Sequence, residues 1–246
     1  MNDNVREEAL EKVFMCSAKC FSYSVMDCGR GAWMAKIDMR DAYKNVPCKP
    51  KDLHLQGFRW LERFFVETRQ IFGARTSVCN FDILGATVLV LVLAQCMILK
   101  NLVHRQLDDV PIVVPEKKKM WCDEFVSKYK TVCKDIGIEL AGECPNLDKA
   151  FSSSQYGKIL GIWFNTKELK WKLPEEKKDK TLRNIEKALR GEGLNLKGMQ
   201  ELMGRLNDVA MMCPFMKTFK GELNKALALD FFNKIDSQLP VTMTPL

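Results

Sequence analysis

The spacing of hydrophobic and polar positions predicts an alternation of helices and short strands in the first part of the chain. Residues 6–18 have helical spacing, and a polar, glycine-containing connection follows them. Residues 33–39 form a short apolar-rich run with a carboxylate near its end, as expected of a core strand that presents a functional side chain. Residues 53–60 and 64–71 are aromatic-rich and joined by a short polar link, so they predict an antiparallel hairpin.

The stretch 83–99 carries no charged side chain and has two interpretations. It falls just short of the roughly 20 apolar residues that a membrane span needs. A helix buried on all sides inside a soluble core gives the same pattern. No second apolar run or aromatic belt accompanies it, so we expect a buried helix and no membrane partner.

Residues 102–114 are rich in β-forming side chains but are interrupted by two adjacent aspartates. We expect two strands here, with the acidic pair at the tip of their turn. The pattern then predicts a charged amphipathic helix at 116–136 and short strands at 138–140 and 159–164.

The last third of the chain, from Pro174 onward, has the pattern of a small three-helix unit. Its apolar positions are Leu182, Ile185 and Leu189, then Met199, Leu202, Met203 and Leu206, then Phe215, Phe219 and Leu223. The first helix also carries a run of Lys and Arg side chains. A solvated face accounts for such a run, and contact with a nucleic-acid backbone is the alternative.

The composition is that of a folded, soluble protein with a mild excess of positive charge. The 246 residues include 38 Lys and Arg against 31 Asp and Glu, which gives a formal charge of +7. This balance favours a polyanionic partner without naming one.

The ten cysteines are scattered, and the start of the chain does not have the pattern of a signal peptide. We therefore expect reduced thiols and an intracellular location, in the cytoplasm or the nucleus. Cys16, Cys20 and Cys28 lie close together, but they lack the paired spacing of a structural zinc site. We interpret them as buried structural thiols.

Two acidic sites stand out at predicted strand ends: Asp38, with Asp41 three residues later, and the pair Asp108 and Asp109. Three convergent carboxylates are the ligands that a pair of Mg²⁺ or Mn²⁺ ions prefers, and such a pair supports phosphoryl transfer. An Asp-Asp pair is also common in ordinary turns. On the pair alone, the plain turn is the better interpretation.

The surrounding motifs favour the metal site. Residues 35–47, AKIDMRDAYKNVP, closely resemble the first polymerase motif of reverse transcriptases. Residues 72–77, 107–109 and 159–162 are similar, in the same order, to the family's Phe-Gly segment, its Tyr-x-Asp-Asp box and its Phe-Leu-Gly primer grip. The segments 137–140 and 173–177 resemble those of DIRS-type retrotransposons, which encode a tyrosine recombinase.

The resemblance covers roughly residues 33–227 and implies an α+β right-hand polymerase. The palm, an antiparallel sheet backed by helices, would span 33–165 and include a fingers hairpin at about 51–72. Residues 1–32 would be an N-terminal helix and a remnant of the fingers. Residues 166–246 would form a small helical thumb.

The same resemblance implies roles for individual residues in RNA-directed DNA synthesis. Asp38, Asp108 and Asp109 would hold two Mg²⁺ or Mn²⁺ ions, with the Met39 carbonyl as a further ligand. The partners would be an RNA or DNA template with its primer, and deoxynucleoside triphosphates (dNTPs). Basic thumb side chains would follow the duplex backbone.

Substrate contacts are implied as well. The backbone amides of Asp41 and Ala42 would lie along the triphosphate, and Tyr43 would exclude a ribose 2′-hydroxyl. Phe72 and Gly73 would pack beside the nucleotide and the template base. As plain alternatives, Tyr43 is a core aromatic and Phe72 packs at a hairpin end.

The turn of residues 159–162 adds Leu160 and Gly161 as the primer grip. The sequence departs from the family elsewhere, since Gln106 stands where the acidic box opens with tyrosine and the residues at 70–71 replace a Leu-Pro pair. Pro111 sits inside the strand that leaves the turn. No lysine is clearly placed as a general acid.

Three functions remain open from the sequence. The first is an active reverse transcriptase domain of a retrotransposon. The second is an inactive or domesticated nucleic-acid-binding remnant, suggested by Gln106, Pro111 and the incomplete fingers. The third is a metal-free structural protein, in which the acidic pair is a plain turn.

Overall fold

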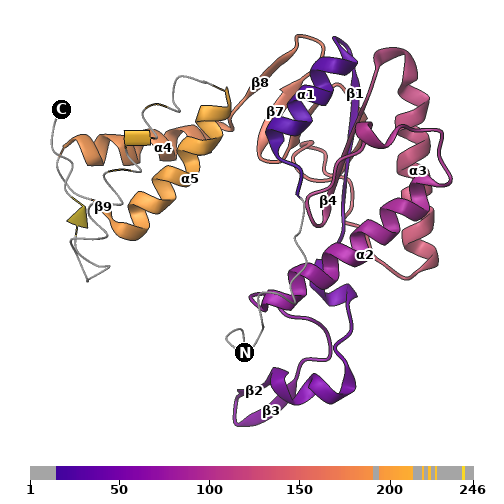
Figure 1. The fold of residues 1–246 in the computed structure, drawn as a ribbon, viewed down its shortest axis with the longest axis vertical. Helices are drawn as coiled ribbons and strands as arrows, with labels where there is room; N and C mark the ends of the chain where they lie inside the picture. The colour runs from indigo at the N-terminus through magenta and orange to yellow at the C-terminus, as the bar shows by residue number, and fades with distance from the viewer. Residues whose placement is uncertain are drawn as a thin grey trace. The chain divides into compact units, whose positions relative to one another are not determined.

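The computed structural model describes residues 15–190 and 194–212, together with positions 218, 221, 222, 225, 240 and 241. The chain forms two compact units, Met1–Trp171 and Lys172–Leu246. Helices and strands are mixed along the chain, as the sequence predicts (Figure 1). Each unit is described by itself.

A three-stranded antiparallel sheet forms the centre of the first unit. Its order is β4 (Asp109–Val114), β1 (Trp33–Asp38), β5 (Phe151–Ser154). The four middle residues of β1 and the last five of β4 are buried. Strands that are buried on both faces read as continuous apolar runs, which is why the pattern at 33–39 identifies this strand.

Helices cover the two faces of this sheet. Helix α3 (Lys119–Asp135) places Phe125 and Tyr129 in the same core as Ala35 and Ile112 of the strands. Helix α1 (Ala18–Cys28) lies on the other side in Figure 1. The prediction of a helix at 116–136 is confirmed, with a 3₁₀ turn at Glu116–Lys118 before it.

The first helix begins where the sequence pattern predicts its end. Of the predicted helix 6–18, residues 6–14 lie outside the described part of the chain, and residues 15–17 are not helical. Ser17 is the N-cap of α1, and its side chain accepts a hydrogen bond from the Cys20 amide. Helix α1 therefore starts after Ser17. It includes residues for which the sequence pattern predicts a polar connection.

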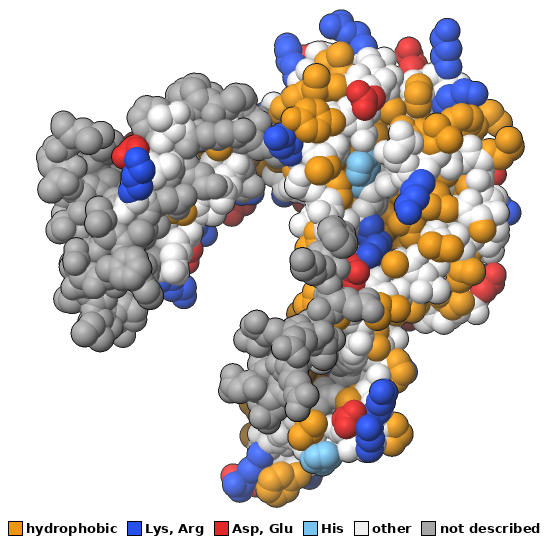
Figure 2. Space-filling model, in the orientation of Figure 1, with side chains coloured by type: hydrophobic (Ala, Val, Ile, Leu, Met, Phe, Trp, Pro, Cys, Tyr) orange, Lys and Arg blue, Asp and Glu red, His pale blue; other side chains and the backbone are white. Residues whose placement is uncertain are grey.

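Helix α2 (Arg75–Leu93) corrects the expectation of a helix buried on all sides. Only 28% of its apolar window Thr76–Leu93 is buried, and Val90 is 64% exposed. Figure 2 shows hydrophobic side chains on the surface where α2 and α3 run in Figure 1. The window is long and apolar enough to cross a bilayer, a property that core helices of soluble proteins share.

The predicted aromatic hairpin is present, but its strands are shorter than the predicted 53–60 and 64–71, since residues 53–56 belong to a 3₁₀ helix and the second strand ends at Val66. Strands β2 (Gly57–Trp60) and β3 (Arg63–Val66) pair antiparallel after a 3₁₀ helix at Pro50–Gln56. Leu61 and Glu62 both have positive φ, as a tight two-residue hairpin turn requires. Every residue of the two strands is exposed.

The predicted strand at 159–164 is in fact a hairpin turn with a strand on each side. β6 (Tyr156–Ile159) pairs with β7 (Ile162–Asn165), and β8 (Lys170–Lys172) completes a second three-stranded sheet. Leu160 and Gly161 have φ of 49° and 79°. Two consecutive residues with positive φ reverse the chain, and the apolar run conceals this reversal.

Two further predicted strands are reduced to isolated bridges. The segment before the acidic turn makes only the bridges Val103↔Ile112 and Gln106↔Asp109. The segment 138–140 contributes one bridge, Met39↔Leu140.

Two helices of the second unit confirm the predicted pattern. Helices α4 (Glu175–Leu189) and α5 (Leu196–Met212) share a core of Met199, Leu202, Met203 and Leu206, with Ile185 packed against it. A short pair, β9 (Leu194–Asn195) and β10 (Pro240–Val241), accompanies them. Of the predicted third helix, the apolar positions Phe215, Phe219 and Leu223 lie outside the described residues.

The expectation of buried thiols at Cys16, Cys20 and Cys28 is wrong, because Cys16 and Cys28 are only half-buried and Cys20 is exposed. Cys122 and Cys133 lie in the core, whereas Cys20 is exposed. Cys16 is half-buried, with its Sγ 3.2 Å from Nδ1 of His104. The exposure of Cys20 arises because α1 begins at this point of the chain and leaves its first turn at the surface.

Gly157 offers a test of the packing between the two sheets. A Cβ at this position would collide with the ring of Phe151, whereas a Cβ at Gly142 would meet no atom within 4 Å. We expect Gly157→Ala to lower the free energy of unfolding by about 1–3 kcal/mol, since overpacking forces side chains and backbone to shift. Urea unfolding measures this change. Gly142→Ala is the matched control, and equal losses in the two variants would contradict the packing.

Candidate metal and nucleotide site

The three aspartates of the predicted metal site lie at one end of the central sheet. Asp38 is the last residue of β1 and pairs directly with Asp109, the first residue of β4. Asp108 precedes it in a turn that Leu107 makes possible with a φ of 54°. The Met39 amide donates a hydrogen bond to the Asp108 carbonyl over 3.1 Å, which fixes this turn against the end of β1.

The charges of these carboxylates act on one another. Burial raises the pKa of Asp38, and the negative charge of Asp108 raises it further. Burial also raises the pKa of Asp109, whereas Lys36 lowers it. A position that disfavours ionised carboxylates in this way is stabilised by a cation.

Lys36 is the cation that the sequence analysis missed. Its side chain is 7% exposed, and its Nζ lies 3.5 Å from Oδ1 of Asp109 and 3.4 Å from the carbonyl oxygen of Asp148. Residues two apart on a strand share a face, so the spacing of Lys36 and Asp38 gives the signal that could have identified it.

The donor set fits hard divalent cations, because it consists of carboxylate oxygens at the ends of two paired strands. Within residues 15–190 and 194–212, however, no three Cys, His, Asp or Glu side chains are grouped as a metal site requires. Asp109 is instead engaged by Lys36. Asp38, Asp108 and Asp109 are therefore brought together as neighbours without converging on one point.

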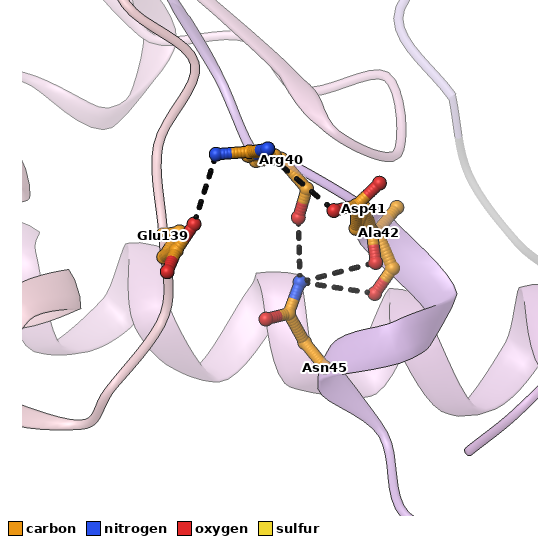
Figure 3. A network of polar contacts seen from close by, with 5 residues as sticks. All are labelled: Arg40, Asp41, Ala42, Asn45 and Glu139. Atoms are coloured by element: carbon orange, nitrogen blue, oxygen red, sulfur yellow. Dashed lines mark hydrogen bonds and ion pairs between the residues drawn. The ribbon is translucent and has the colours of Figure 1, made fainter.

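The turn after β1 has a defined backbone, held by one side chain. Asp41 adopts the left-handed conformation with a φ of 51°. The Asn45 amide donates hydrogen bonds to the carbonyl oxygens of Arg40, Asp41 and Ala42, at 2.9, 3.4 and 3.2 Å (Figure 3). The carbonyls of this turn thus face Asn45.

A neighbouring segment anchors the same turn from the other side. The Arg40 guanidinium reaches Oε2 of Glu139 at 3.2 Å and Oδ2 of Asp41 at 3.6 Å. The Arg40 amide donates to the Glu139 carbonyl, and the Ala141 amide donates to the Asp38 carbonyl, each over 2.9 Å. These contacts fix the position of Asp38 relative to the turn that carries Asp41 and Ala42.

Tyr43 and Phe72 lie together beside the aspartates. Tyr43 is 8% exposed, and its ring packs edge-on against those of Phe72 and Phe81. The ring centroids are 4.8 Å apart for Phe72 and 5.8 Å apart for Phe81. Burial raises the pKa of the Tyr43 hydroxyl, and the charge of Asp108 adds to the effect. Phe72 is 73% exposed, next to Gly73 with a φ of 87°. Tyr43 is thus a core aromatic that also lies within the field of Asp108.

Leu160 and Gly161 are the two central residues of the β6–β7 turn. Both are half-buried. A tight turn of this kind presents backbone atoms rather than long side chains, which is compatible with contact to a nucleic-acid backbone.

The sequence matches no protein-family model and no curated protein. Its structure is similar to solved foamy viral enzymes. One is the protease-reverse transcriptase dRH in complex with double-stranded DNA, with a TM-score of 0.60 and 15% identity over 93% of this chain and 35% of that one. Another is the protease-reverse transcriptase in complex with an RNA/DNA hybrid, with a TM-score of 0.54 and 16% identity over 90% of this chain and 27% of that one.

The chain thus has a reverse-transcriptase-like fold and spans about a third of the length of the first of these enzymes. At this identity, the similarity shows the fold and leaves the activity to be argued from the site.

The raised pKa of Asp38 predicts a pH-dependent effect of Asp38→Asn on stability. The folded protein binds the Asp38 proton more tightly than the unfolded chain, so wild-type stability falls as pH rises from 3.8 through the folded pKa. The variant does not titrate there. We expect its stability relative to the wild type to increase across this window and then stay constant, as measured by urea unfolding with chelator present.

Glu67→Gln is the control with the opposite sign. A hydrogen bond from Lys44 lowers the pKa of Glu67 below 4.5, so this carboxylate stabilises the fold at higher pH. Its replacement should lower stability above that range. A loss of stability at neutral pH in Asp38→Asn as well would contradict the destabilised state of Asp38.

Proposed function

We propose that this chain is a reverse transcriptase domain from a DIRS-type retrotransposon, which adds dNTPs to a primer 3′-hydroxyl. The observation that supports it is the pairing of Asp38 with Asp109 across β1 and β4, with Asp108 in the adjoining turn. This arrangement occurs in a chain whose fold is similar to reverse transcriptases solved with double-stranded DNA and with an RNA/DNA hybrid.

In this proposal the central sheet with α2 and α3 is the palm. Helix α1 belongs to the N-terminal helix and fingers remnant at residues 1–32, and the β2–β3 hairpin belongs to the fingers. Helices α4 and α5 belong to the thumb. The exposed aromatic hairpin supports the fingers assignment, because aromatic side chains at a surface offer stacking partners for nucleic-acid bases.

Asp38, Asp108 and Asp109, with the Met39 carbonyl, would hold two Mg²⁺ or Mn²⁺ ions. Bound there, such ions activate the primer hydroxyl and neutralise the charge that develops on the leaving pyrophosphate. The partners of the chain would be an RNA or DNA template with its primer and dNTPs, and its location would be intracellular.

The residues of the chain would position the substrate. Asn45 engages the carbonyls of the turn, which leaves the amides of Asp41 and Ala42 to contact the triphosphate. Tyr43 sits beside Asp108 and would limit the space for a ribose 2′-hydroxyl. The exposed ring of Phe72, with Gly73, would pack against the nucleotide and template base.

A nucleic-acid-binding remnant without catalysis is the second candidate. Two observations favour it: Gln106 occupies the place of the primer-contacting tyrosine, and Lys36 engages Asp109. Both would lower catalysis without removing the basic side chains that bind phosphates.

Primer extension separates the two candidates. We expect the purified chain to extend a DNA primer on an RNA template with Mg²⁺ or Mn²⁺. Asp108→Asn should reduce extension about 100-fold or more, because it removes a carboxylate that would hold the metal ions at the reacting centre. Asp135→Asn, at an exposed position at the end of α3, is the matched control and should extend normally. If the wild type binds primer and template but does not extend the primer, the chain is a nucleic-acid-binding remnant without catalysis.

A further inference from the structure

Lys36 is an unusual residue for the middle strand of a sheet, because its charge is held inside the molecule. It is 6% exposed as a residue and lies on β1 between β4 and β5. A buried ammonium is stable only when it is paired and hydrogen-bonded. Oδ1 of Asp109 and the Asp148 carbonyl provide these partners at 3.5 and 3.4 Å.

The register of the sheet explains why Lys36 reaches Asp109. Asp38 and Asp109 are direct cross-strand partners, and Lys36 lies two residues before Asp38 on the same face. Lys36 is therefore the diagonal neighbour of Asp109, within reach of a long side chain. Backbone pairing thus places a cation beside one carboxylate of the cluster.

Among the described residues the three carboxylates do not form a common ligand group, and Lys36 engages one of them, Asp109. A carboxylate oxygen engaged by an ammonium has less negative charge to offer to a metal ion. Since both cations seek the same oxygens, Lys36 and a divalent ion compete for Asp109.

We propose that Lys36 is a positioning residue that serves as the internal counter-cation of Asp109 and is displaced from it when a divalent metal binds. The inference rests on the proposed function, because it takes the aspartates as metal ligands. It assigns Lys36 two opposite effects: it stabilises the metal-free fold, and it weakens metal binding.

The contact with Asp148 extends the effect to the loop before β5. Burial raises the pKa of Asp38, and the positive charges of Lys36 itself and of Lys149, next to Asp148, lower it. Displacement of Lys36 therefore changes the electrostatic surroundings of Asp38 as well as those of Asp109.

The test is Mn²⁺ binding by the purified chain, followed by electron paramagnetic resonance, with thermal unfolding measured in chelator and in Mn²⁺. Lys36→Met keeps a long buried side chain without charge and should bind Mn²⁺ about five- to tenfold more tightly. It should unfold at a lower temperature than the wild type in chelator, and Mn²⁺ should reduce that difference. Lys36→Arg keeps the charge and should bind Mn²⁺ nearly as the wild type does.

Lys36→Gln replaces the Met variant if the latter does not fold, with the same expectation of tighter binding. Unchanged or weaker Mn²⁺ binding by the uncharged variant overturns the inference. So does a loss of stability that is equal in chelator and in Mn²⁺, since a merely structural lysine would have that effect.

Failure of the proposed function has a different signature. Mn²⁺ binding that appears only in the uncharged variant, with no primer extension by the wild type, supports the competition by Lys36 and overturns the polymerase activity. Primer extension by the wild type, together with unchanged Mn²⁺ affinity in Lys36→Met, upholds the polymerase and overturns the role of Lys36.

Discussion

The antiparallel register of β1 and β4 is the constraint on which the rest of the structure depends. It pairs Asp38 with Asp109 at the end of both strands and leaves their middle residues buried on both faces. A shift of one residue would turn the apolar positions of each strand to the opposite face and separate the two aspartates. The same hydrogen-bonded ladder therefore serves the core and the candidate site.

This arrangement places like charges in an unfavourable position. Carboxylates directly opposite each other on paired strands repel, and partial burial raises the pKa of both Asp38 and Asp109. Lys36 offsets part of that repulsion from within the sheet. Functional centres commonly hold ionised groups that repel one another and that a nearby cation stabilises.

The segments around the strand ends give the site its geometry. Asn45 and Glu139 fix the turn after β1, and the positive φ of Leu107 closes the turn before β4. Tyr43 joins this region to the core through its contacts with Phe72 and Phe81. The candidate site thus consists of loops held by a rigid sheet, as is usual for binding and catalytic residues.

The sequence by itself determined the elements with strong local patterns: the strand before Asp38, the acidic turn, the aromatic hairpin and α3. Local periodicity and turn chemistry are sufficient there, because neighbouring residues carry the signal. Only the tertiary structure decided that Ser17 caps α1, that Leu160 and Gly161 reverse the chain, and that α2 keeps an exposed apolar side. It also decided the pairing of Lys36 with Asp109. Each of these depends on backbone conformation, on capping, or on contacts between residues far apart in the chain, and hydrophobic spacing does not encode them.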